Sequence, residues 1–303
     1  MCKKVVLIIF LVFLAGNVFS QNNTSDQSDQ QISDFSLAGY GDQGKKTWDL
    51  AGASADIFTD IIKLTQVVGN LYGEQEDVHL VSEKGDFDKK EGKVHLEDNV
   101  VITTSSGAKL TTDSLDWDRK NQEVSTKDIV NIEKESMTAV ATGAKGEPTL
   151  NKVALEKDVR VDINPTAEEE ESDDPQVKEK IIITCDGPLD IDYEKNIAVF
   201  RNNVKVERTD SIIYSDIMDV YFGKNTPGAS ESKVPGLMGN KIDKIVARGN
   251  VKIVRGENIS YSEEAVYSAA DKKITLTGRP KIVIVSTEDM KGTVSGDANK
   301  DTQ

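Results

Sequence analysis

The sequence predicts an all-β fold, because one ten-residue, strand-like unit recurs five times along the chain. In each unit the residues at offsets −6, −4, 0 and +2 from a reference position are apolar, and those at −3 and −1 are polar. An apolar residue at every second position is typical of a strand with one buried face, whereas a helix would scatter these offsets around its surface. The units span residues 93–102, 152–161, 197–206, 244–253 and 273–282.

The apolar positions of these units are the candidate functional residues. From the pattern alone, their shared face is either the core of an ordinary β-sandwich or a surface that accepts a ligand. An Asn, Asp or Gly usually precedes the reference position, which predicts a bulge or bend, because these residues tolerate unusual backbone angles. The candidates are Val94, Leu96, Val100, Ile102, Val153, Leu155, Val159, Val161, Phe200, Val204, Val206, Ile245, Val251, Ile253, Ile274, Leu276, Ile282 and, in the register of the last unit, Ile284.

Composition narrows the class of protein. The chain has 303 residues, enough for two domains. Hydrophobic residues make up 37% and aromatic residues 6%, which favours a long, shallow sheet over a thick closed core. The formal net charge of −15 argues against nucleic acid as a partner, because phosphate binding requires clustered Lys and Arg.

The N-terminus has the features of an export signal. Lys3 and Lys4 precede an apolar run over residues 5–15, which is too short to span a membrane, and a cut is expected ahead of Gln21. Residues 1–20 are therefore predicted to be a signal peptide, with a retained membrane anchor as the alternative. After cleavage Cys185 is the one remaining cysteine, so no internal disulfide can form, and it is expected to be a small buried side chain.

A first β domain is expected over residues 47–163. Residues 21–46 before it are rich in Gln, Ser, Asp and Gly and predict a disordered lead. Residues 53–68 fit either a helix face or a strand. A hairpin of 77–81 and 93–102 around a polar turn at 84–92 should follow, and then strands at 110–116, 122–126, 129–133 and 152–163.

A second β domain is expected over residues 180–298, after an acidic linker at 164–179. The linker carboxylates could instead form a calcium loop, but they lack the Asp-x-Asp-x-Gly spacing of such a loop. A Pro/Gly/Ser-rich loop at 223–240 interrupts this domain. We expect the two domains to dock edge to edge, with the linker serving as a tether. The predicted strands are 180–184, 190–193, 197–206, 211–222, 241–253, 258–268 and 273–285.

The sequence contains no recognisable catalytic constellation. His79 and His95 are the two histidines, and both fall in strand positions that face polar neighbours. Neither a Gly-x-Ser-x-Gly elbow nor a phosphate-binding Gly loop is present, and one thiol cannot form a cysteine-rich metal site. These observations favour a binding or scaffold role without a cofactor over an enzyme.

Short motifs in both halves resemble periplasmic proteins of lipopolysaccharide export. The second half, over roughly residues 180–295, resembles the LptA-like or organic-solvent-tolerance (OstA-like) domain in Gly249-Asn250-Val251-Lys252-Ile253, Tyr261-Ser262-Glu263 and the segment 273–280. The first half is similar to LptC in Trp48-Asp49-Leu50, in the segment 94–100 and in the segment 110–118.

The resemblance implies two incompletely closed, antiparallel β-jelly-roll modules in tandem, each a bent, V-shaped sheet. It implies a non-enzymatic bridge component that holds the lipid A acyl chains of lipopolysaccharide in its apolar interior. Partners would stack on its edge strands, between the inner-membrane transporter complex and the outer-membrane translocon. The chain departs from the family by joining both modules and by replacing the usual inner-membrane helix with a short signal. Because ligand and protein are both anionic, recognition is expected to rest on burial of acyl chains.

Two other functions fit the strand pattern. A secreted structural or adhesive β-repeat protein would have a closed core and bind no lipid. A stand-alone periplasmic lipid carrier would not stack end to end. Lipid that copurifies with the protein would exclude the first alternative, and end-to-end oligomers would exclude the second.

Overall fold

A computed structural model describes residues 30–41, 44–73, 76–134, 136–147, 152–164, 180–222, 242–271 and 273–285. Within these ranges the chain forms seventeen strands in one antiparallel sheet, which confirms the all-β prediction. No helix in this part of the chain is long and apolar enough to cross a membrane. The predicted signal peptide, the linker from residue 165 and the loop at 223–240 lie outside the described residues.

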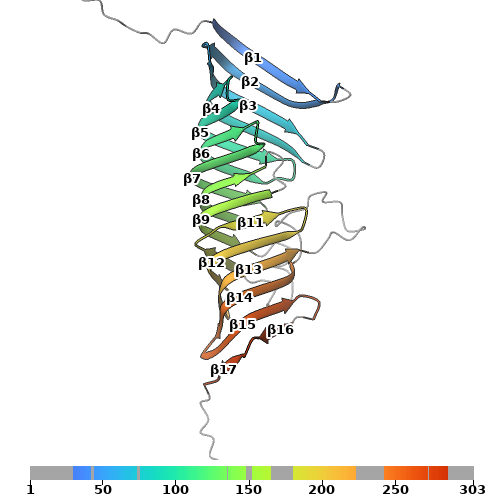
Figure 1. Cartoon of the computed structure of the whole chain (residues 1–303), viewed down its shortest axis with the longest axis vertical. Helices are drawn as coiled ribbons and strands as arrows, with labels where there is room; N and C mark the ends of the chain where they lie inside the picture. The colour runs from blue at the N-terminus through green and yellow to red at the C-terminus, as the bar shows by residue number, and fades with distance from the viewer. Residues whose placement is uncertain are drawn as a thin grey trace, which may run out of the picture.

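The strands follow one another in chain order along an elongated molecule, so that β1 and β17 lie at opposite ends (Figure 1). β10 and β11 both pair with β9 on one side and β12 on the other, and β16 and β17 both pair with β15. The strands are β1 (Gln30–Tyr40), β2 (Lys46–Ile57), β3 (Ile61–Tyr72), β4 (Asp77–Asp88), β5 (Lys93–Thr104), β6 (Lys109–Asp118), β7 (Glu123–Lys134), β8 (Met137–Gly146), β9 (Lys152–Ile163), β10 (Ile181–Cys185), β11 (Leu189–Asp192), β12 (Ile197–Glu207), β13 (Ile212–Phe222), β14 (Ile242–Arg255), β15 (Asn258–Ser268), β16 (Lys273–Thr277) and β17 (Lys281–Val283).

The two halves dock edge to edge, as predicted. β9, the last strand before the linker, pairs directly with β10 and β11, the first strands after it. The junction therefore has the same hydrogen-bonded geometry as every other strand pair, and the sheet continues through it without interruption.

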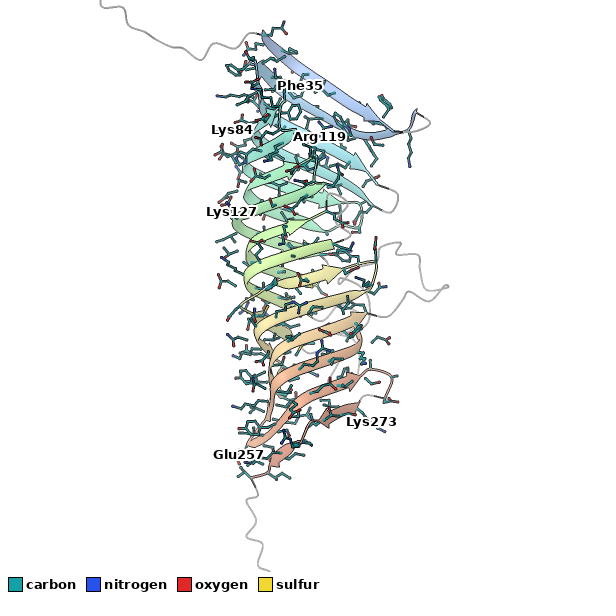
Figure 2. All side chains as sticks on the ribbon, in the orientation of Figure 1. Phe35, Lys84, Arg119, Lys127, Glu257 and Lys273 are labelled. Carbon is teal, nitrogen blue, oxygen red and sulfur yellow. The ribbon has the colours of Figure 1, made fainter. Side chains whose placement is uncertain are left out.

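Each repeated unit contains the predicted bulge or bend. All five units have residues with positive φ immediately before the reference position, and the pairing register shifts there in β5, β12 and β14. A bulge bends its strand and increases the local twist. Lys84 and Lys127, which lie beside such register shifts, sit along the same margin of the molecule (Figure 2). The positive-φ residues are Asp98 and Asn99, Asp158, Asn202 and Asn203, Gly249 and Asn250, and Gly278 and Arg279.

The bent sheet buries its own apolar face. The described residues contain no second sheet and no helix that could cover this face, so the two arms of the bent strands pack against each other. The buried side chains form two clusters, one from β1 to β6 and one from β7 to β15. The second cluster includes residues on both sides of the linker, so the core does not divide where the two predicted domains meet.

The predicted disordered lead is wrong over residues 30–40, because they form β1 and pair with β2. Two aromatic side chains lie over glycines of the opposite strand: Phe35 packs on Gly52, and Trp48 packs on Gly39. A side chain at either glycine would overlap the aromatic ring. The strand depends on these cross-strand contacts rather than on its own apolar content, which is why its composition did not predict it.

Several element boundaries also differ from the predictions. Residues 53–57 and 61–68 are strand and belong to β2 and β3, with a turn between them. The turn predicted at 84–92 is limited to residues 89–92, because β4 extends to Asp88. Residues 122–126 and 129–133 belong to one bulged strand, β7, and the segment 273–285 is broken into β16 and β17. β8 was not predicted, since its Ala, Thr and Gly residues give little strand signal.

Candidate functional site

Three ladders of inward-facing residues run across the sheet, each joining residues that lie directly opposite one another on neighbouring strands. The long ladder is apolar except for one glycine and one serine, and it extends without a gap from β1 to β17. Its members are Leu37, Leu50, Gly69, Leu80, Ile102, Leu110, Ile132, Ala139, Val161, Ile183, Val206, Ile213, Ile253, Ser260 and Ile282.

The central ladder forms the deepest part of the interior. Every member except the last is buried, and the ladder passes from β9 to β11 and β12 across the junction of the two halves. Its members are Thr126, Ala144, Leu155, Leu189, Phe200, Met218, Ala247, Ala265 and Leu276.

The rim ladder lies nearer the ends of the strands, and its side chains are partly exposed except for the buried Ile191, Ala198 and Val220. Its members are Ile57, Ile62, Phe87, Val94, Trp117, Val124, Gly146, Val153, Ile191, Ala198, Val220, Ile245, Tyr267 and Ile274. Together the three ladders give one inward face that is nearly continuous in apolar character along the molecule.

The sequence candidates lie on this inward face, but their burial differs along the chain. In the middle of the molecule they are buried: Leu96, Val100, Ile102, Leu155, Val159, Val161, Phe200, Val204, Val206 and Val251. Val94, Val153, Ile245, Ile253 and Leu276 are half-buried. Ile274, Ile282 and Ile284 are exposed, at 51%, 61% and 73%, because no further strand follows β17 in the described residues.

Sequence reasoning missed the inward residues of the intervening strands. The five units lie in β5, β9, β12, β14 and β16–β17, and some inward residues of the strands between them are small or polar, such as Thr112, Ala141 and Ser215. A sixth unit in β7 was also missed. Counted from Val130, it has Val124 at −6 and Ile132 at +2, but Thr126 takes the apolar position at −4.

An arginine and three aromatic rings connect distant strands in the first half. The guanidinium of Arg119, in the turn after β6, lies 5.9 Å from the ring centre of Trp48, 5.8 Å from that of Phe87 and 5.9 Å from that of Trp117. Phe87 and Trp117 belong to the rim ladder. Trp48 pairs with Leu71 near the start of β2, whereas the rim-ladder residue of that strand, Ile57, lies at its end. Cation–π contacts therefore tie the two arms of the bent sheet together, at the same end of the molecule as Phe35 (Figure 2).

An electrostatic effect also extends from the first half of the chain to the second. Burial raises the pKa of Tyr193, in the turn after β11, to about 12, and the carboxylate of Glu76 in the first half adds to this shift. Glu76 accepts a hydrogen bond from the hydroxyl of Ser106, and Lys134 Nζ lies 3.2 Å from that same hydroxyl. The carboxylate of Glu76 in the first half thus acts electrostatically on a tyrosine of the second.

Ion pairs lie mainly on the solvent side and at strand ends. Hydrogen bonds from Lys46, Asn70 and Tyr72 lower the pKa of Asp49 to about 2. As predicted, His79 and His95 face polar neighbours: their Nδ1 atoms lie 2.8 Å from Asn70 Oδ1 and 2.7 Å from Asp116 Oδ1. Cys185 is buried as expected, and this burial raises the pKa of its thiol. No cluster of potential metal ligands occurs among the residues with described positions.

Two protein families match the chain, one in each half. Residues 5–164 match the family model described as lipopolysaccharide-assembly, LptC-related. Residues 187–298 match the model described as LptA/(LptD N-terminal domain) LPS transport protein. No curated protein matches the chain. β10 lies between the two matched regions. Its Ile183 pairs with Val161 of the first region and Val206 of the second, so the long ladder is continuous between them.

Proposed function

The chain belongs to the LptC-related family of lipopolysaccharide-assembly proteins and continues into an LptA-like domain, and from this premise we propose that it carries lipopolysaccharide acyl chains along its apolar interior. As a component of lipopolysaccharide transport, it would act as a binding protein and not as an enzyme. The continuous long ladder is the observation that carries the proposal, because it provides one apolar surface from β1 to β17.

The physical requirement for such a surface is strong. Each methylene of an acyl chain exposed to water costs about 0.8 kcal/mol, so an amphiphile with several chains needs shielding throughout its passage. A bent sheet can cover the chains while the headgroup stays in water. The candidates from Val94 to Ile284 would line this path, with the buried residues in the middle separating to admit a chain and the exposed ones forming its C-terminal end.

The two terminal strands are the proposed docking sites for other transport components. β1 has Ile32, Leu37 and Tyr40 exposed, and the C-terminal end has exposed isoleucines on the rim and long ladders. An edge strand offers unpaired backbone groups to a strand of another protein. We propose that the inner-membrane transporter complex and the outer-membrane translocon are reached through such edge-to-edge stacking.

We also propose a periplasmic location that follows cleavage of residues 1–20. The mature protein should then begin at Gln21 and fractionate with soluble periplasmic material. Recovery of an uncleaved chain from the inner membrane would instead identify the segment as an anchor. Mass spectrometry of the intact purified protein distinguishes the two.

Site-specific photocrosslinking tests lipid binding directly. A photoreactive phenylalanine analogue at Ile253, on the long ladder, should form adducts with lipopolysaccharide. The same analogue at the adjacent Lys252 faces the opposite side of the sheet and is the matched control. Equal adducts at both positions would contradict the proposal, and the absence of adducts at Ile253 would favour a closed-core structural protein.

A charge at the C-terminal end of the sheet tests whether acyl chains load there. Ile282 is 61% exposed, so Ile282→Arg should change the free energy of unfolding by less than about 1 kcal/mol. It should nevertheless reduce lipid loading strongly, because it places a guanidinium on the acyl path. Lys281→Glu, which faces the other side of β17, should leave loading unchanged. Global unfolding of the Ile282→Arg variant without bound lipid would point to the structural alternative.

A further inference from the structure

Two serine hydroxyls in the interior of the second half have no hydrogen-bond partner. Ser215 of β13 lies opposite Val204, and Ser262 of β15 lies opposite Val251. Directly opposed residues of an antiparallel pair point to the same face, so both serines face the apolar interior. Ser215 is 4% exposed, and the Oγ atoms of both are buried without a partner among the described residues.

The corresponding polar side chains of two other units have partners within the protein. Thr112, opposite Val100, has its hydroxyl 3.4 Å from that of Thr126. Cys185, opposite Val159, hydrogen-bonds with the backbone. The side chain at this position therefore has a hydrogen-bond partner within the protein in β6 and β10, and has none among the described residues in β13 and β15.

Unsatisfied buried hydroxyls are uncommon because they cost folding free energy. When a chain breaks such a rule, the position is often a functional one. The two serines also share their sequence neighbours, since each follows a tyrosine and precedes a carboxylate residue. They lie two strands apart, about 10 Å, with Val251 of β14 between them. A single elongated ligand in the interior would pass both.

We infer that Ser215 and Ser262 donate hydrogen bonds to oxygen atoms on the acyl region of the ligand, such as a hydroxyl or ester oxygen. The second half then prefers chains that carry oxygen over plain hydrocarbon chains. This inference rests on the proposed function, because it requires acyl chains to enter the interior. One or two neutral hydrogen bonds should give a preference of about three- to tenfold in Kd.

The test compares tetradecanoic acid with 3-hydroxytetradecanoic acid, each measured by calorimetric titration of the lipid-free protein. The wild type should bind the hydroxylated chain about three- to tenfold more tightly. The Ser215→Ala/Ser262→Ala variant should lose this preference and bind the plain chain with unchanged Kd. Ser268→Ala is the matched control in β15, because its hydroxyl lies at the strand end, 3.3 Å from Asp271, and it should keep the preference.

Thermal unfolding supplies an independent readout. Ser215→Ala should raise the Tm of the lipid-free protein, because it removes an unsatisfied buried group. A lower Tm would overturn the inference by showing that the hydroxyl has a partner within the protein. A wild type without preference, or a double variant that retains it, would also overturn it. Failure of both fatty acids to bind would instead overturn the proposed function, and the inference with it.

Discussion

Replacement of Leu189 by alanine tests whether the interior is one structural unit across the junction of the two halves. Leu189 is 0% exposed and lies between Leu155 of β9 and Phe200 of β12. The change removes three side-chain carbons, about 2.4 kcal/mol at about 0.8 kcal/mol each, and leaves a cavity. We therefore expect the free energy of unfolding to fall by about 3 kcal/mol.

Hydrogen exchange followed by mass spectrometry shows which strands lose stability. If the cluster from β7 to β15 opens as a unit, amides of β8 and β9 should exchange faster by the same factor as those of β12 and β13, roughly a hundredfold. Leu276→Ala is the matched control, because Leu276 is half-buried near the end of the same ladder and should cost less than about 1.5 kcal/mol. Faster exchange in β12 and β13 alone, with wild-type protection in β8 and β9, would refute the reasoning.

Three further outcomes are expected. Arg119→Gln should lower the free energy of unfolding by about 1–2 kcal/mol through loss of its cation–π contacts, measured by the fluorescence of Trp48 and Trp117 in urea, with Lys120→Gln nearly neutral. Asp49 has a pKa of about 2 in the folded protein, so its contribution is present at neutral pH and is lost as the pH falls below about 4 toward 2. Asp49→Asn should therefore lower Tm at pH 7 and flatten the Tm profile in acid; an unchanged profile would contradict this. Replacing residues 168–171 of the linker with Gly and Ser should leave lipid binding intact, because β9 already pairs with β10 and β11; a large loss of binding would make the acidic run part of the site.

The sequence by itself determined which faces are apolar in the strands that carry the repeated unit. Alternation of apolar and polar residues is a local property, so Val94, Leu96, Val100 and Ile102 could be assigned to one face without knowledge of any neighbour. The bulges were predictable for the same reason, because Asp98 and Asn99 tolerate positive φ in any context. The short motifs that resemble the LptC and LptA-like families were equally readable, and the family matches agree with them.

The tertiary structure decided how these faces combine. The step of the long ladder from Val161 to Ile183 and Val206 depends on hydrogen bonds between strands separated by the linker, and no local pattern specifies that register. β1 pairs with β2, and Phe35 and Trp48 pack on glycines of the opposite strand, a contact that the composition of β1 does not reveal. The +2 position of the unit is buried at Val206 and exposed at Ile282, although both units carry the apolar pattern. Burial depends on which strands follow and how the arms bend together, and these are properties of the assembled sheet rather than of any one strand.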